Sequence, residues 1–129
     1  MQRKLPHITP ETEMTTAISE LQKFKLLGAP VFDDNKSLVG FISEQELLQP
    51  LMQNSYFCDG VVKVKQLMRT DVVTVSSDQN IIELADAMKT GKPKNYPVIE
   101  GGKVVGMISR GDVLKALYEN YVSCQEHQV

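Results

Sequence analysis

Apolar residues recur along this chain with two alternating periods, one helical and one typical of strands. In the second half, helical spacing from 81 to 88 predicts an amphipathic helix. The apolar runs 97–99 and 103–108 then flank Glu100-Gly101-Gly102, which predicts a hairpin because glycine accepts the positive φ of a tight turn. Helical spacing returns from 113 to 121. The second half therefore predicts a helix, a hairpin and another helix.

The first half predicts the same series. Apolar residues keep helical spacing from 14 to 24, and we expect this helix to end at Gly28, before Pro30. A hairpin with its turn at 33–36 follows, and a second apolar helical stripe covers 47–52.

The two halves also align residue by residue. A shift of 67 residues (75 − 8) aligns 8–11 with 75–78, and a shift of 66 (105 − 39) aligns 39–43 with 105–109. Short β segments, at Ile8 and at 72–75, precede the first helix of each copy. This pattern predicts an α+β fold of two β-α-β-β-α repeats related by pseudo-two-fold symmetry, with the two small sheets packed together and the helices outside. The expected boundaries are repeat 1 at 1–53, a linker at 54–69, repeat 2 at 70–122 and a polar tail at 123–129.

Composition narrows the classes of function. The chain has 129 residues, 42% of them hydrophobic, and a formal net charge of −2, so it lacks the broad basic surface that a nucleic-acid partner requires. No apolar stretch is long enough for a membrane span, and the start lacks the apolar block of a signal peptide, so we expect a cytoplasmic protein. We expect free thiols at Cys58 and Cys124. His7 and His127 have no second ligand at metal spacing, so we expect no metal site.

Catalytic residues are not apparent. Neither histidine nor cysteine falls in a repeated motif, and no nucleophile has an obvious base beside it. We therefore expect that the protein is not an enzyme and requires no cofactor.

The strongest chemical signal is a strand-to-helix junction that occurs twice. In repeat 2, Gly106 is followed by Ser109, Arg110 and Asp112, and in repeat 1 the corresponding positions include Ser43 and Glu46. A serine followed three residues later by an acid forms a capping box, in which the side chains bond to free backbone N–H groups. A helix start also attracts phosphate. Both interpretations stay open for repeat 2, whereas Ser43 and Glu46 favour the cap.

The full pattern around these junctions resembles the CBS (cystathionine-β-synthase) domain family. It comprises Pro-Val-Ile at 97–99, a turn, Val-Gly-x-Ile-Ser-x-x-Asp-x-Leu at 105–114, and the lead-in 67–75. The paired arrangement resembles a CBS pair, or Bateman module, from about His7 to Tyr121. The resemblance implies regulatory binding of an adenosyl ligand (AMP, ADP, ATP or S-adenosylmethionine) and pairing into homodimers.

The resemblance also implies roles for individual residues of repeat 2. Asp112 would hold the ribose hydroxyls and Ser109 the phosphate, with Arg110 as a second phosphate contact. Arg110 could equally be a solvated surface arginine. The remaining positions would surround adenine or line the same cleft: Lys94, Asn95, Tyr96, Pro97, Met107, Thr70 and Val73.

The corresponding site of repeat 1, with Ala29, Phe41, Ser43 and Glu46, departs from the family pattern. Glu46 stands where the family has aspartate, and Glu44 adds negative charge where a phosphate would bind. We therefore expect this second site to be weak or empty.

Two hypotheses follow. The first is a regulatory module that binds an adenosyl nucleotide mainly through repeat 2 and signals by a conformational shift to an effector protein in trans. The second is a ligand-free dimerisation or protein-interaction module in which both serine–acid motifs act only as helix caps.

Overall fold

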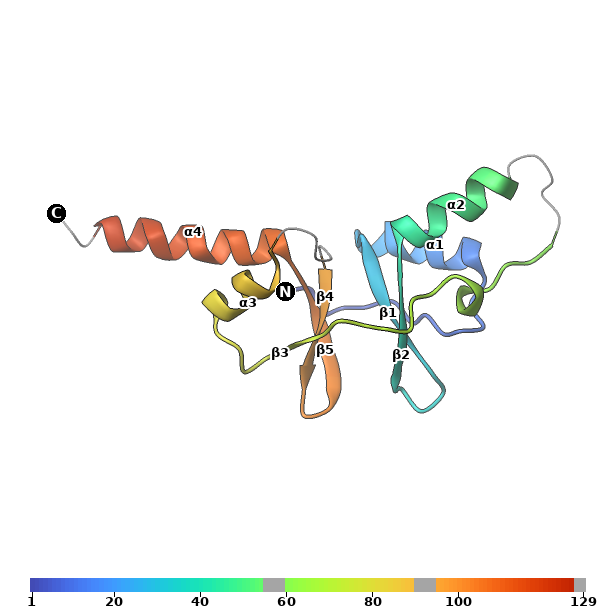
Figure 1. Cartoon of the computed structure of the whole chain (residues 1–129), viewed down its shortest axis with the longest axis horizontal. Coiled ribbons are helices and arrows are strands. Elements are labelled where there is room, and N and C mark those ends of the chain that lie inside the picture. Colours follow the sequence, from blue (N-terminus) through green and yellow to red (C-terminus); the bar gives the residue numbers. More distant parts are fainter. Residues whose placement is uncertain (55–59, 90–94, 127–129) are drawn as a thin grey trace. The chain divides into compact units, whose positions relative to one another are not determined.

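The computed structural model describes residues 1–54, 60–89 and 95–126, which form four α-helices, one 3-10 helix and two sheets (Figure 1). In chain order the elements are α1 (Met14–Phe24), β1 (Gly28–Phe32), β2 (Leu38–Ser43), α2 (Glu44–Asn54), η1 (Val64–Gln66), β3 (Val75–Ser76), α3 (Ile81–Ala87), β4 (Asn95–Glu100), β5 (Lys103–Ser109) and α4 (Arg110–Glu126). The predicted α+β class and the duplicated helix–hairpin–helix series are confirmed.

The chain divides into two compact units. The first, called here the N-terminal unit, is Lys4–Val73, and the second, the C-terminal unit, is Thr74–Val129 together with Met1–Arg3. Each unit contains one repeat, a small sheet and a core of its own.

In the N-terminal unit, β1 and β2 form an antiparallel hairpin, and α1 buries Met14, Ala17 and Leu21 against its core. The predicted end of α1 at Gly28 is wrong. The helix ends at Phe24 because Lys25 takes the left-handed conformation, with φ 56°. Gly28 instead begins β1, where a Cβ atom would lie 2.7 Å from the Phe41 ring.

The segment 54–69 differs from the linker that we expected. Residues 55–59, which include Cys58, lie outside the described residues. The part beyond them packs into the N-terminal unit: Val64 is fully buried in its core, and its backbone N–H donates to the Thr12 carbonyl oxygen at 2.8 Å. This segment is therefore part of the fold of the first repeat.

In the C-terminal unit, the strands lie in the order β3-β4-β5, with β3 parallel to β4 and β4 antiparallel to β5. Gly101 and Gly102, with φ 58° and 79°, form the predicted hairpin turn. Side chains of β4, α3 and α4 build the core, with Tyr96 among them. α4 continues to Glu126, so most of the tail expected at 123–129 is helical, and 127–129, which include His127, lie outside the described residues.

The first β segment of each repeat is short. Val75 pairs with Val98 in β3, whereas Ile8 forms no strand, and its carbonyl oxygen accepts a hydrogen bond from the Phe32 N–H at 3.0 Å. Ile8 is nonetheless fully buried, so the apolar pattern marked a core position correctly.

Candidate functional site

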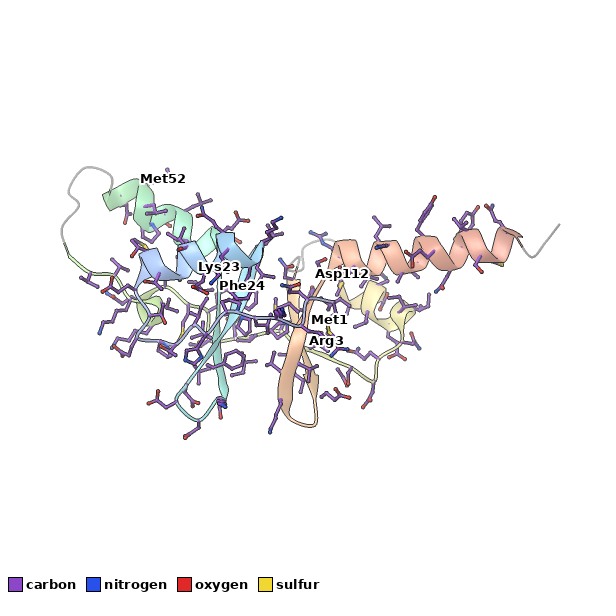
Figure 2. All side chains as sticks on the ribbon, turned by 180° about the vertical axis from the view of Figure 1, so that it is seen from behind. Met1, Arg3, Lys23, Phe24, Met52 and Asp112 are labelled. Carbon is purple, nitrogen blue, oxygen red and sulfur yellow. The ribbon has the colours of Figure 1, made fainter. Side chains whose placement is uncertain are left out.

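The repeat 2 junction is a complete capping box at the start of α4. The Ser109 hydroxyl accepts from the Asp112 N–H at 3.1 Å, and Asp112 Oδ2 accepts from the Ser109 N–H at 3.0 Å. Both reported contacts of the Asp112 carboxylate use Oδ2, the second being the Met1 amino group at 3.9 Å (Figure 2). Within the described residues Oδ1 has no partner, and 41% of the side chain is exposed. The carboxylate therefore caps the helix through one oxygen and leaves the other without a described partner.

The capping box of repeat 1, which the sequence predicted from Ser43 and Glu46, is less complete than that of repeat 2. Glu46 Oε1 accepts from the Ser43 N–H at 3.2 Å, and it also accepts from the Ser43 hydroxyl at 2.8 Å. The longer side chain thereby engages the hydroxyl, and the described residues show no bond from the Glu46 N–H to that hydroxyl in return.

Arg110 adds a second positive charge to the repeat 2 junction, besides the Met1 amino group. It is the first residue of α4 and partly buried, and within the described part of the chain its guanidinium forms no hydrogen bond or ion pair. A helix start already favours anions because its first N–H groups lack partners within the helix. An anion at this junction would therefore meet both a positively charged side chain and the N-terminus of a helix.

The neighbouring predicted residues occupy different environments. Asn95 pairs with Ser109 across the hairpin, Pro97 pairs with Met107, and both members of the second pair are buried. Tyr96 is 1% exposed and belongs to the core of the C-terminal unit, so its ring is a packing element in this structure. Lys94 lies outside the described residues.

Burial raises the pKa of Tyr96, while the positive charge of Arg110 acts to lower it. A tyrosine is protonated at neutral pH even without this shift, so the Tyr96 hydroxyl can donate a hydrogen bond. No described group accepts that hydrogen bond, since the Tyr96 oxygen is buried without a partner.

The lead-in residues Thr70 and Val73 belong to the N-terminal unit. Their neighbour Arg69 exchanges two backbone hydrogen bonds of 2.8 Å with Phe41 of β2. A Cβ atom on Gly40 would lie 2.7 Å from Met68 Sδ and 2.9 Å from the Arg69 carbonyl oxygen, so glycine permits this close approach. The lead-in of repeat 2 therefore lines the junction of repeat 1.

The equivalent position in the C-terminal unit is taken by Met1–Arg3, which the sequence reasoning missed. Gln2 exchanges two backbone hydrogen bonds of 2.8 Å with Met107, and a Cβ atom on Gly106 would lie 2.7 Å from the Gln2 carbonyl oxygen. Figure 2 shows Met1 and Arg3 in this unit, with Met1 near Asp112. The signal was in the repeat itself, because the shift of 67 residues places Met1 on Met68 and Gln2 on Arg69.

The other positions predicted for a second site, Ala29 and Phe41, lie in β1 and β2. Ala29 is fully buried and pairs with Ile42, while Phe41 pairs with Pro30 and packs its ring over Gly28.

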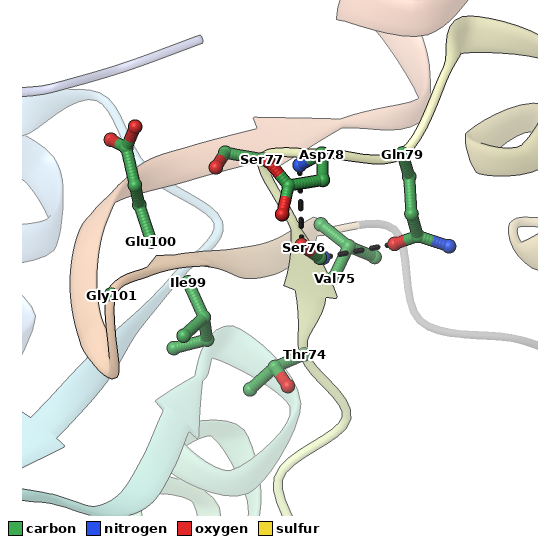
Figure 3. Close-up of a pocket in the computed structure, with 9 residues that line it drawn as sticks. All are labelled: Thr74, Val75, Ser76, Ser77, Asp78, Gln79, Ile99, Glu100 and Gly101. Atoms are coloured by element: carbon green, nitrogen blue, oxygen red, sulfur yellow. Dashed lines mark hydrogen bonds between the residues drawn. The ribbon is translucent and has the colours of Figure 1, made fainter.

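A pocket of about 470 Å³ with a mixed polar and apolar lining lies at the other end of the C-terminal sheet (Figure 3). Its lining residues come from β3 and the residues on either side of it and from the tip of the β4–β5 hairpin: Thr74, Val75, Ser76, Ser77, Asp78, Gln79, Ile99, Glu100 and Gly101. Asn95 and Ser109 pair at the end of the hairpin next to α4, whereas Glu100 and Lys103 pair at the tip. This pocket is therefore separate from the Ser109–Asp112 junction.

Two further searches concern only the described residues. Among them, no three or more histidine, cysteine, aspartate or glutamate side chains gather as metal ligands would. None of the described helices combines the length and apolar character that crossing a membrane demands.

Comparison with known proteins identifies the duplicated unit. The profile of the CBS domain matches twice, at residues 1–52 and 64–119. The chain belongs to the CBS domain family. It is a CBS pair, a type of regulatory module, and the predicted resemblance is confirmed.

Individual CBS proteins resemble the chain over most of its length. The methylated protein MJ0556 of Methanocaldococcus jannaschii is 29% identical over 88% of this chain and 68% of its own length. The structure of CBSX2 in complex with AMP is 29% identical, with a TM-score of 0.74, over 92% of this chain and 90% of that one. The CBS-domain protein ATU1752 from Agrobacterium tumefaciens is 25% identical, with a TM-score of 0.76, over 88% and 84%.

Other curated relatives are much longer proteins. The chain spans 28% of MJ1232 and 12% of an Aquifex aeolicus A-adding tRNA nucleotidyltransferase. In such proteins the matching region is one part of a larger whole.

Proposed function

We propose that this CBS pair is a sensor that binds an adenine nucleotide mainly through repeat 2. The observation that carries the proposal is the Asp112 carboxylate, which caps α4 through Oδ2 and leaves Oδ1 for ribose hydroxyls. Ser109 and Arg110 stand beside it at a helix start, where phosphate is favoured. CBSX2, a relative of the same fold, has been crystallised with AMP.

The site we propose adds one segment to the sequence prediction. Backbone pairing joins Gln2 to Met107, so Met1–Arg3 would flank a nucleotide held by Asp112. Repeat 1 offers a weaker site, because Glu46 uses one oxygen for both the N–H and the hydroxyl of Ser43.

We further propose that the chain forms a homodimer and that ligand binding changes its arrangement, which an effector protein then detects in trans. The second helix of each repeat carries an exposed apolar face: Leu48, Leu51, Met52, Leu114 and Tyr118. Leu48 and Leu114 occupy equivalent repeat positions and are 60% and 69% exposed. A second copy of the chain offers matching faces for both.

Calorimetric titration of AMP, ADP, ATP and S-adenosylmethionine tests the nucleotide proposal. We expect saturable heat with at least one of them, and a ligand at one hundred times its Kd should stabilise the fold by about 2.7 kcal/mol. Asp112→Ala should abolish this stabilisation, whereas the matched variant Glu46→Ala should keep it. Absence of heat with all four ligands at millimolar concentration would contradict the proposal.

The second candidate function is a ligand-free interaction module, which the complete Ser109–Asp112 capping box favours. On this hypothesis Asp112→Ala lowers the melting temperature and no nucleotide changes it in the wild-type protein. A thermal-shift experiment with the same ligand panel distinguishes the two functions.

A further inference from the structure

Tyr96 is a buried polar residue whose hydroxyl has no partner among the described residues. The side chain is 1% exposed, and its oxygen forms no hydrogen bond within the described part of the chain. Buried polar groups of this kind are rare because leaving one without a partner destabilises the fold. Phenylalanine would fill the same space in the core without that penalty. The hydroxyl therefore needs an explanation other than packing.

Its place in the fold suggests that explanation. Tyr96 pairs with Ile108, the residue before the N-cap Ser109, and packs in the same core cluster as Val113 of the first turn of α4. The Arg110 guanidinium is close enough to act electrostatically on the phenol. A buried donor thus lies by the start of a 17-residue helix and its first cation.

The charges at this helix start favour an anion on one side and a sugar on the other. Arg110 has no anionic partner among the described residues, and the first N–H groups of α4 add partial positive charge. Asp112 directs Oδ2 to the Ser109 N–H, which partly neutralises the carboxylate on the helix side. The Tyr96 hydroxyl and the Arg110 guanidinium are both hydrogen-bond donors without a described partner. An anionic acceptor such as phosphate could bind both of them.

We propose that the Tyr96 hydroxyl donates a hydrogen bond to a phosphate oxygen of the ligand, with Arg110 as the counter-charge. This proposal rests on the nucleotide function above and narrows its ligand class. The site would prefer phosphate-bearing adenine nucleotides over uncharged adenosine and over the sulfonium ligand S-adenosylmethionine. The ligand-free protein would then contain an unsatisfied donor that nucleotide binding satisfies.

The test compares AMP with adenosine, which shares the base and ribose but lacks the phosphate, in titrations of the wild type and Tyr96→Phe. A hydrogen bond to a charged group corresponds to about a tenfold change in Kd or more. We expect Tyr96→Phe to weaken the binding of AMP by that factor and to leave the Kd of adenosine unchanged. Arg110→Gln should show the same selective loss. Tyr121→Phe, at an exposed tyrosine further along α4, is the matched control and should change neither Kd.

The melting temperature of the ligand-free variant provides a second measurement. Tyr96→Phe should melt at or above the wild-type temperature, because it removes a buried group without a partner. A lower melting temperature would show that the hydroxyl has a partner within the protein and would overturn the inference.

The binding outcomes separate this inference from the proposed function. Equal effects of Tyr96→Phe on AMP and adenosine, or no effect on either, overturn the role of the hydroxyl while nucleotide binding stands. Failure of the wild type to bind both ligands removes the proposed function and this inference with it.

Discussion

Arg69 and Phe41 exchange two backbone hydrogen bonds of 2.8 Å, so the segment that introduces repeat 2 completes the β-structure of repeat 1. Gln2 and Met107 repeat this arrangement in the C-terminal unit with the same two distances. Each junction is therefore flanked by the lead-in of the other repeat. The glycine before each junction, Gly40 or Gly106, makes the close approach possible.

Gly106→Ala should displace Met1–Arg3 from β5, because the new Cβ atom would lie 2.7 Å from the Gln2 carbonyl oxygen. We expect a loss of about 1–3 kcal/mol in unfolding free energy, typical of overpacking. Faster hydrogen exchange of the Met107 amide should accompany this loss.

Gly111→Ala is the matched control. The nearest atom to its Cβ would be Ser109 Oγ at 3.5 Å, and alanine favours a helix by up to about 1 kcal/mol. If the Met107 amide exchanged its hydrogen as slowly in Gly106→Ala as in the wild type, the pairing of Met1–Arg3 with β5 would not depend on the glycine.

Ser109→Ala should lower the unfolding free energy by about 1 kcal/mol, because the Ser109 hydroxyl caps the Asp112 N–H. Ser43→Ala should lower the unfolding free energy by less, since the Ser43 hydroxyl donates to the Glu46 carboxylate and caps no backbone N–H in the described residues. Urea denaturation of both variants gives the comparison. Equal losses would mean that the two boxes cap their helices to the same extent.

Glu11 should make the stability of the N-terminal unit sensitive to acid. Hydrogen bonds from Lys63, at 2.6 Å, and from Lys65, at 2.8 Å, lower the pKa of Glu11 to about 2. Because the folded-state pKa lies below the unfolded value, the stabilisation is fully present above about pH 4.5 and is lost as the pH falls towards 2.

The experiment compares the wild type with Glu11→Gln across this pH range. The wild type should be the more stable at pH 7, and the difference should disappear near pH 2. Since Glu11 is exposed, added salt should also reduce the difference. A difference that stays constant with pH would exclude the ion pairs as its source.

Leu114→Glu should shift the proposed homodimer towards monomer by placing a charge on the exposed apolar face of α4. Leu48→Glu, at the equivalent position of α2, should act in the same direction. Sedimentation equilibrium measures the mass, with Ile82→Glu, an exposed apolar position on α3, as the control. An unchanged mass in both leucine variants would place any dimer contact elsewhere.

The sequence predicted the elements well because their signals are local. Helical spacing from Met14 to Leu21 corresponds to the buried side of α1, and Gly101 and Gly102 take the positive φ values expected of the hairpin turn. The α1 end was misplaced because Lys25, which lacks the usual preference of glycine, adopts the left-handed cap.

The site was harder to predict because it depends on contacts between distant segments. The motif residues Ser109 and Asp112 were found together, since three residues separate them along one helix turn. The exchange of the lead-ins was not apparent, because hydrophobic pattern does not show which β segment pairs with which. Tyr96 was predicted beside adenine from its place before Pro97, and the local pattern did not show that it packs in the core with side chains of α3 and α4.

The pairing of Gln2 with Met107 also fixes an order of events during synthesis. These partners lie 105 residues apart (107 − 2), whereas Lys4–Val73 is continuous along the chain. Because chains emerge from the ribosome N-terminus first, the N-terminal unit can fold while Met1–Arg3 still waits for β5. Met1–Arg3 are thus translated well before their partner strand, and their pairing with Met107 has to wait until β5 has emerged.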